Sequence, residues 1–131
     1  MITYTDTADA ISPDQLRGFF VDWPVAPSAE RRLELLSGSH AVELALDGDA
    51  VVGFVTAISD GVMSAFIPLL EVLPEYQHQG IGTELVRRLL GQLDELYMID
   101  LCCDAGLEPF YRALGFQTLD RGMGIRRRGN I

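Results

Sequence analysis

Residues 70–83 read Leu-Glu-Val-Leu-Pro-Glu-Tyr-Gln-His-Gln-Gly-Ile-Gly-Thr, and this stretch decides the fold. Its pattern predicts a strand, then a turn at Pro74, then a loop with two glycines that opens directly into a helix. The first N–H groups of a helix lack partners within the helix, and the helix dipole favours anions at that end. Gly80 and Gly82 carry no side chain, so a ligand can approach the backbone closely. The stretch therefore predicts a cradle for a phosphate or pyrophosphate group.

The residues after this loop continue an alternation of helices and strands. Apolar residues at helical spacing predict a helix over 80–93, and residues 97–103 are strand-like. A short helix is expected over 109–114, because a proline stands near its start and a glycine just past its end. Residues 116–119 and 123–127 are expected to close the chain as two strands around the turn Asp-Arg-Gly.

The residues before the loop predict the rest of the sheet. A first strand is expected over 1–5, a helix that starts at the capping box Ser12–Gln15, a loop over 22–28 and a second short helix over 29–37. The strand-like segments 40–46, 50–58 and 62–72 are joined by turn sequences and form a meander. The whole order is typical of a mixed α/β fold, a mostly antiparallel sheet flanked by about four helices, in a single domain over 1–131.

Pro68 lies inside the last strand of this meander. Proline cannot donate a hydrogen bond to a neighbouring strand, so it is confined to edges, bulges and places where strands separate. We therefore expect an irregularity of the sheet at this residue.

The composition excludes several classes of protein. The hydrophobic share of 48% and the charged share of 22% are those of a globular chain. All ten basic residues are arginine, which excludes a P-loop with its Gly-Lys-Ser/Thr signature. A net charge of −9 argues against a nucleic-acid partner. The sequence has no membrane-span pattern, no signal peptide, no zinc-ligand spacing and only the adjacent Cys102 and Cys103. It therefore predicts a reduced, soluble, cytoplasmic protein without a metal.

The charge is spread unevenly along the chain. Residues 1–76 hold 12 acids and three arginines, a net charge of −9, whereas residues 77–131 hold seven acids and seven arginines and are neutral. The simple interpretation is a surface charge that aids solubility. The second interpretation is that two ligands of different charge meet on this protein.

Two motifs together resemble the GNAT superfamily of N-acetyltransferases. The segment Gln77–Gly82 fits the coenzyme-A-binding pattern Gln/Arg-x-x-Gly-x-Gly/Ala and follows Val-Leu-Pro at 72–74. About 30 residues downstream, Glu108–Phe116 is similar to the family segment Phe-Tyr-x-x-x-Gly-Phe that follows the fifth strand. A Rossmann fold would need Gly-x-Gly-x-x-Gly, which is absent.

The resemblance implies a fold and a cosubstrate. Strands four and five would splay apart to admit the thioester of acetyl-CoA, and the pantetheine arm would run beside strand four. Backbone N–H groups at the start of the following helix would hold the pyrophosphate. The acetyl-CoA-binding residues implied are Leu70, Val72, Gln77, His78, Gln79, Gly80, Ile81, Gly82 and Thr83.

The resemblance also implies a general acid. Tyr111 matches the family tyrosine that protonates the departing thiolate, and without the motif it would be interpreted as a packed core residue. A thiol has a pKa of about 8.5 and a phenol of about 10, so a phenol can stabilise charge that develops on sulfur. Many family members have an asparagine about seven residues earlier, where this chain has Asp104. Asp104 either caps the next helix or acts on the acceptor.

A general base is also needed. The pKa of a primary amine, near 10.4, lies about three units above neutral pH. Deprotonating the amine to its nucleophilic form therefore costs roughly 4 kcal/mol. The candidates are Glu71, Glu43, His40, Asp60 and Asp104. Glu71 comes first, because it lies on the strand beside the thioester; pairing with an arginine or facing solvent is its alternative role.

The acceptor is expected to be a small cationic amine. In the family that the chain resembles, the first two helices and their loop shape the acceptor site, and here that half carries the acidic charge. Phe19, Phe20 and Trp23 either line this site or pack in the core. The function predicted is transfer of an acetyl group from acetyl-CoA to a primary amine in a ternary complex. The alternatives are a non-catalytic acyl-CoA-binding module and a protein, peptide or tRNA-amine N-acetyltransferase. A homodimer that completes the site is a further hypothesis.

Overall fold

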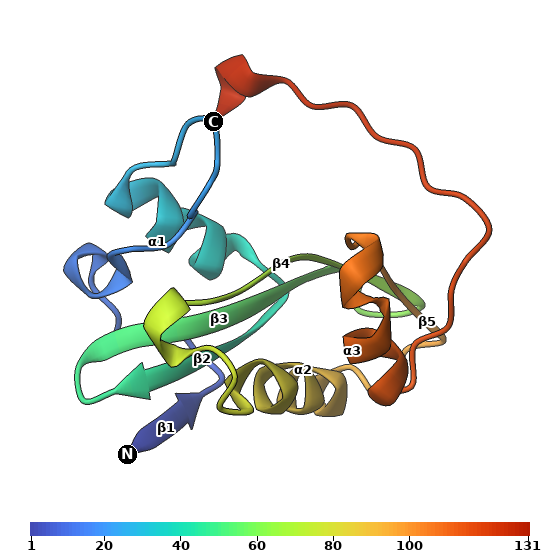
Figure 1. The fold of residues 1–131 in the computed structure, drawn as a ribbon, viewed down its shortest axis with the longest axis horizontal. Helices are drawn as coiled ribbons and strands as arrows, with labels where there is room; N and C mark the ends of the chain where they lie inside the picture. Colours follow the sequence, from blue (N-terminus) through green and yellow to red (C-terminus); the bar gives the residue numbers. More distant parts are fainter.

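The computed structural model describes residues 1–131 and contains one five-stranded sheet in the order β1-β2-β3-β4-β5 (Figure 1). The first four strands are antiparallel neighbours, and β4 and β5 are parallel, so the mixed, mostly antiparallel sheet is confirmed. The strands are β1 (Ile2–Thr5), β2 (Ala41–Asp47), β3 (Ala50–Ser59), β4 (Ser64–Val72) and β5 (Met98–Leu101). The helices are α1 (Ala29–Gly38), α2 (Ile81–Gln92) and α3 (Glu108–Ala113), with 3-10 turns η1 (Pro13–Leu16), η2 (Pro74–Tyr76), η3 (Ala105–Leu107) and η4 (Arg128–Asn130).

β4 and β5 separate at Pro68, as expected. Their pairing runs from Ser64 opposite Met98 to Ile67 opposite Leu101 and stops there. The rest of β4 pairs only with β3, because its other edge has lost its neighbour. Proline has no N–H for the ladder, so the sequence itself ends the pairing at this position.

The two faces of the sheet are covered by different helices. On one face lies α2, whose side chains Ile81 and Leu85 pack so closely that a Cβ on Gly53 would lie 3.3 and 3.1 Å from them. On the other face η1 and α1 cover Phe54, whose ring stacks edge-on against Phe19 at 5.0 Å. Both layers join one apolar core, which holds the fold together by burial.

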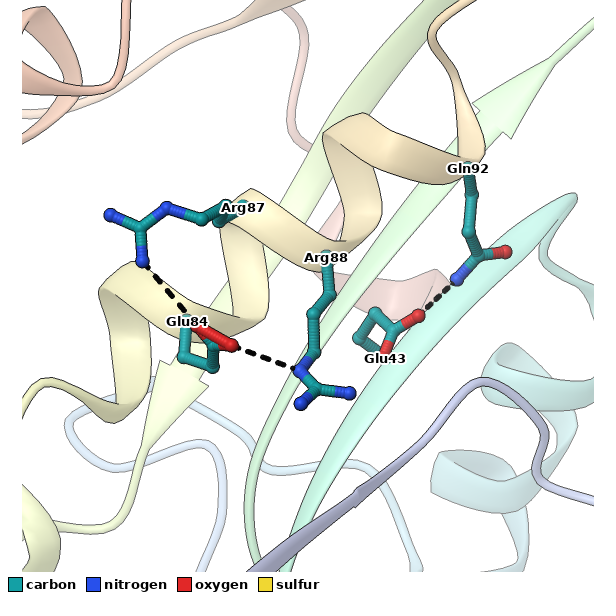
Figure 2. A network of polar contacts seen from close by, with 5 residues as sticks. All are labelled: Glu43, Glu84, Arg87, Arg88 and Gln92. Carbon is teal, nitrogen blue, oxygen red and sulfur yellow. Dashed lines mark hydrogen bonds and ion pairs between the residues drawn. The ribbon is translucent and has the colours of Figure 1, made fainter.

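A polar network fastens α2 to the sheet (Figure 2). Glu43 on β2 is buried, and Gln92 at the end of α2 donates hydrogen bonds to its carboxylate and to the carbonyl of Val42. Burial raises the pKa of the Glu43 carboxyl, and the hydrogen bond from Gln92 opposes that shift. On the outer side of the helix, Glu84 pairs with two arginines, at 87 and 88. Glu43 is therefore a structural residue of the α2 face.

Three expectations about the fold are wrong. The chain has three α-helices rather than about four, because the first expected helix is only the 3-10 turn η1. This turn does not continue as a helix, since the backbone is extended at Arg17 and Gly18 follows with a φ of +86°. The two closing strands over 116–119 and 123–127 do not form; this part of the chain has no regular structure before η4. The strand expected over 97–103 is shorter, because β5 ends at Leu101; Cys102 and Cys103 lie beyond it and are both exposed.

The C-terminal segment takes an unusual course. After α3 it runs out from the body and arches across to α1, where η4 ends the chain (Figure 1). The guanidinium of Arg31 on α1 donates a hydrogen bond to the carbonyl of Asn130 at 3.4 Å. No helix in the structure combines the length and the apolar character that crossing a bilayer requires.

Candidate functional site

The start of α2 presents a row of free backbone donors. The N–H groups of the six residues His78–Thr83 make no hydrogen bond within the protein, and the helical ladder begins with Glu84 N–H to the Gly80 carbonyl at 3.1 Å. The backbone adopts φ values of +63° at His78 and +84° at Gly80, which turn the chain sharply into the helix. We call His78–Thr83 the phosphate loop. Its free donors and the helix dipole make it suited to an anion.

The loop is fixed to the end of β4. Gln77 donates a side-chain hydrogen bond to the carbonyl of Val72 at 3.0 Å, so this side chain closes the loop onto the strand. Gln79 points back instead, to the carbonyl of Glu75 at 3.4 Å. Leu70 and Val72 pair with β3 on one side, and β5 is absent from the other. On that open side the Val72 carbonyl accepts Gln77, while the backbone of Leu70 is free. An extended ligand arm can therefore add along this edge.

Tyr111 lies on α3, beside the phosphate loop. Its ring is buried between Phe110 and Phe116, with ring centroids at 4.9 and 5.6 Å. The phenol hydroxyl has no hydrogen-bond partner in the protein. Burial raises the pKa of the Tyr111 phenol, and nearby Cys103 adds to the shift. A Cβ on Gly82 would lie 3.5 Å from the Phe110 ring, which shows how closely α3 approaches the loop.

Four of the five candidate bases lie away from the phosphate loop and Tyr111 or have a structural role. Glu43 is held under α2. His40 is exposed just before β2. The Asp60 carboxylate accepts backbone hydrogen bonds from Val62, Met63 and Ser64, and these bonds lower its pKa. Asp104 is exposed at the start of η3 and makes no side-chain capping bond. These positions leave Glu71 as the remaining candidate base.

Glu71 points to the α1 face of β4. Its two carboxylate oxygens accept the backbone N–H of Phe20 at 2.9 Å each, and one also accepts the N–H of Val21 at 3.3 Å. Phe20 and Asp22 adopt φ values of +66° and +64°, so the carboxylate holds a tight, unusual turn. A carboxylate has about four acceptor sites, so capacity for a further proton donor remains.

A groove of about 360 Å³ lies on the same face. Its walls come from the loop after η1, from α1, from β4 and from the end of the chain. The lining residues are Phe20, Trp23, Pro27, Arg31, Glu34, Leu35, Leu69 and Ile131. Phe20 and Trp23 meet edge to face at 4.9 Å; Phe19 and Phe20 both belong to the core, while Trp23 is exposed. We call the space between these residues the acceptor groove.

Arg32 holds the loop that forms the groove. Its guanidinium donates to the carbonyls of Leu16 and Pro27, at 2.7 and 3.1 Å, and lies 5.6 Å from the centre of the Phe20 ring. Glu71 and Arg32 therefore fix the same loop from two sides. No sequence pattern marks the groove positions Glu34 and Leu69, which line the groove together with Trp23 and Pro27 of the loop.

The two binding features lie on opposite faces of the sheet. The phosphate loop and Gly82 belong to the α2 face, and Glu71 with the groove belongs to the α1 face. After Ile67, β4 and β5 no longer pair. The chain also contains no group of three or more His, Cys, Asp or Glu side chains placed to hold a metal ion.

Comparison with known proteins identifies relatives over most of the chain. The model of the acetyltransferase (GNAT) family matches residues 8–116. A solved structure from Deinococcus radiodurans R1 is 42% identical, with a TM-score of 0.94 over 98% of this chain and 90% of that one. A GNAT-family acetyltransferase from Streptococcus pneumoniae TIGR4 is 37% identical, with a TM-score of 0.81 over 98% and 99%. The N-acetyltransferase ycf52 of Pyropia yezoensis is 31% identical over 73% of this chain.

Two facts limit what these similarities show about this chain. The chain spans 33% and 58% of the length of the first two curated relatives that it matches. An aminoglycoside N-acetyltransferase in complex with CoA has a TM-score of 0.68 but is only 18% identical, so it shares the fold alone.

Proposed function

Since this chain belongs to the acetyltransferase (GNAT) family, we propose that it transfers an acetyl group from acetyl-CoA to a primary amine. The observation that carries the proposal is the phosphate loop, six free N–H groups beside a strand edge that has lost its neighbour. The pyrophosphate would bind these donors, and the pantetheine arm would follow Leu70–Val72 toward the opening. Binding of CoA by a structural neighbour supports the same cosubstrate.

The acceptor would reach the thioester from the opposite face. Its amine nitrogen attacks the carbonyl carbon, which gives a tetrahedral intermediate; the C–S bond then breaks, and the acetyl group stays on nitrogen. Tyr111 donates its phenolic proton to the departing sulfur, and Glu71 takes a proton from the amine. The Tyr111 phenol carries its proton at neutral pH, since the ordinary pKa of a phenol is about 10. Burial raises that pKa further, so the phenol acts by donating a hydrogen bond and then its proton only as the sulfur leaves as a more basic thiolate.

The acceptor groove favours a cationic amine with an apolar body. Phe20, Trp23 and Leu69 supply apolar and aromatic walls. Glu34 supplies negative charge, while the guanidinium of Arg31, on the same groove, is turned to the Asn130 carbonyl. Glu71 holds the Phe20 backbone at the edge of this loop. A cation beside an aromatic face gains about 0.5–2 kcal/mol. The excess of acids in residues 1–76 would also steer a cation toward this side.

The substitution Tyr111→Phe tests the proposed acid. We expect kcat to fall by about 10²–10⁴-fold, the range for loss of a positioned acid, with the Kd for acetyl-CoA nearly unchanged. Tyr97→Phe is the matched control, because that side chain is 84% exposed. Loss of acetyl-CoA binding in the Tyr111 variant would show instead that the ring is only a packing residue.

The cytoplasmic location expected from the sequence stays a proposal. It is supported by the two exposed, unpaired thiols of Cys102 and Cys103, which suit a reducing compartment.

A further inference from the structure

Two side chains of opposite charge on α1 line the acceptor groove without pairing to each other. Arg31 and Glu34 stand three residues apart and lie on one helix face with Leu35, so this face is a wall of the groove. On α2 an acid and an arginine at the same spacing, Glu84 and Arg87, form an ion pair. Arg31 and Glu34 form none, and both residues are exposed. The groove therefore presents a separate positive and negative group.

The guanidinium of Arg31 has most of its hydrogen-bond donors free. Its side chain makes one hydrogen bond, to the carbonyl of Asn130 at 3.4 Å, which is longer than a typical N–H···O bond. A guanidinium has five N–H donors, in a planar arrangement that matches the two oxygens of a carboxylate. A carboxylate in the groove would therefore replace a weak, neutral partner with a charged, bidentate one.

The spacing of the two charges indicates the kind of ligand group that they fit. The carboxylate of Glu34 is bonded to no other group of the protein and can accept from a cation. Side chains three residues apart on a helix have Cβ atoms about 5–6 Å apart. Arg31 and Glu34 therefore suit an anion and a cation that lie close together on one ligand. The α-carboxylate and α-ammonium of a free amino acid are such a pair, because both are bonded to the same carbon.

The other walls of the groove lead from α1 toward Glu71. Phe20, Trp23 and Leu69 make these walls apolar. Leu69 and Glu71 stand two residues apart on β4, so their side chains point to the same face of the sheet. The Glu71 carboxylate also accepts the N–H of Phe20 at 2.9 Å. A methylene chain would fit between the apolar walls, and an amine at its end would come close to the proposed base.

We propose that the acceptor is a free basic amino acid and that its side-chain amine receives the acetyl group. Arg31 holds the α-carboxylate, Glu34 holds the α-ammonium, and the methylene chain crosses the apolar walls toward Glu71. This inference rests on the proposed acetyl transfer and names its acceptor. The side-chain nitrogen bonds to the acetyl carbon and the C–S bond breaks, while Glu71 takes the amine proton and Tyr111 protonates the sulfur. A basic amino acid is a cation overall, which agrees with the acidic charge of residues 1–76.

Calorimetric titration with three ligands, in the presence of CoA, tests the two charged contacts without turnover. Lysine carries both head groups, lysinamide lacks the carboxylate, and ε-aminocaproate lacks the α-ammonium. We expect lysine to bind about tenfold more tightly than lysinamide, and about two- to fivefold more tightly than ε-aminocaproate. Lysinamide is the more positive ligand, so a general attraction to the acidic surface would give the opposite order.

The substitution Arg31→Gln should weaken the binding of lysine about tenfold and leave that of lysinamide unchanged. Glu34→Gln should remove the preference for lysine over ε-aminocaproate. Arg17→Gln is the control, because that side chain is 81% exposed and lies outside the groove. The proposal is wrong if lysine binds no more tightly than lysinamide, or if Arg31→Gln weakens both ligands equally.

Analysis of the product separates this inference from the proposed function. With lysine and acetyl-CoA we expect NMR to find the acetyl group on the side-chain nitrogen. Acetylation of the α-nitrogen, or turnover of polyamines and arylalkylamines but not of lysine, would overturn the inference and leave acetyl transfer to amines intact. Binding of lysine that depends on Arg31, without turnover of any amine, would keep the amino-acid site and refute the acetyl transfer.

Discussion

The two halves of the site are built in different ways. The donor half, Pro68–Thr83 with α3, comes from two contiguous segments, and its contacts are mostly short in sequence, such as Gln77 to Val72. The acceptor half, η1 to α1 with the acceptor groove, depends on contacts between distant residues. Glu71 reaches the Phe20 N–H across 51 residues, and Ile131 closes the groove from the end of the chain. Local motifs thus encode the proposed binding of acetyl-CoA, while tertiary contacts shape the proposed acceptor site.

The halves also differ in how many roles one residue carries. In the donor half the backbone itself is the proposed binding group, and the side chains mainly fix its conformation. In the acceptor half Glu71 holds the loop and is also the proposed base. Changes in the acceptor half should therefore affect folding and function together, whereas changes in the donor half should separate them.

Glu71→Gln should have the largest effect on the acceptor half. An amide keeps one oxygen for the Phe20 N–H but cannot take a proton, so we expect kcat/KM for the amine to fall by about 10²-fold at neutral pH. The deficit should shrink as the pH rises toward the pKa of the amine, because less of the amine then needs a base. A pH–rate profile of both proteins checks this. A deficit that is the same at every pH would mean that Glu71 only positions the loop.

Gly80→Ala tests the backbone of the donor half. A side chain at φ +84° costs about 1–2 kcal/mol, so we expect the Kd for acetyl-CoA to rise by about tenfold as the phosphate loop is distorted. Gly91→Ala is the control, since it lies inside α2 with open space around it. That variant should gain up to about 1 kcal/mol of unfolding free energy and bind acetyl-CoA normally. Equal binding by all three proteins would refute the role of the loop.

Thr56→Val tests β3, the strand that lies beneath the acceptor half. The Thr56 hydroxyl is buried on β3 and has no hydrogen-bond partner, a cost that valine would remove. We expect the free energy of unfolding to rise by about 1 kcal/mol in denaturant titrations. Thr3→Val on the exposed side of β1 should change it little. A clear loss of stability in the Thr56 variant would mean that the hydroxyl is satisfied in solution.

Glu34→Gln gives the smallest expected effect, because the side chain is exposed at the rim of the groove. We expect the KM for a cationic amine to rise about two- to fivefold at low salt and to recover at high salt. The KM for acetyl-CoA should not change. Glu30→Gln, one turn earlier on α1 and outside the groove, is the control. Identical KM values for the two variants would argue against a cation at Glu34.

The sequence predicted the parts of the fold that depend on local patterns. Pro68 marked the separation of β4 from β5, and the segment from Gln77 to Gly82 marked the loop and the start of α2. It did not predict the backbone bonds of Glu71 or the groove positions Glu34 and Leu69, because these depend on how the η1 loop folds over β4. The prediction of strands after Phe116 was wrong, since a strand also needs a neighbour to pair with and this segment has none.

Release of thiol from acetyl-CoA across a panel of amines tests the proposed function most directly. The panel would hold polyamines, aminoglycosides, arylalkylamines, neutral amino acids and basic peptides, with Tyr111→Phe in parallel. The proposal predicts turnover with a cationic class and little with neutral or acidic amines at low salt. It also predicts that turnover is lost in the variant. Tight binding of acetyl-CoA without turnover on any amine would contradict it and indicate a non-catalytic acyl-CoA-binding module.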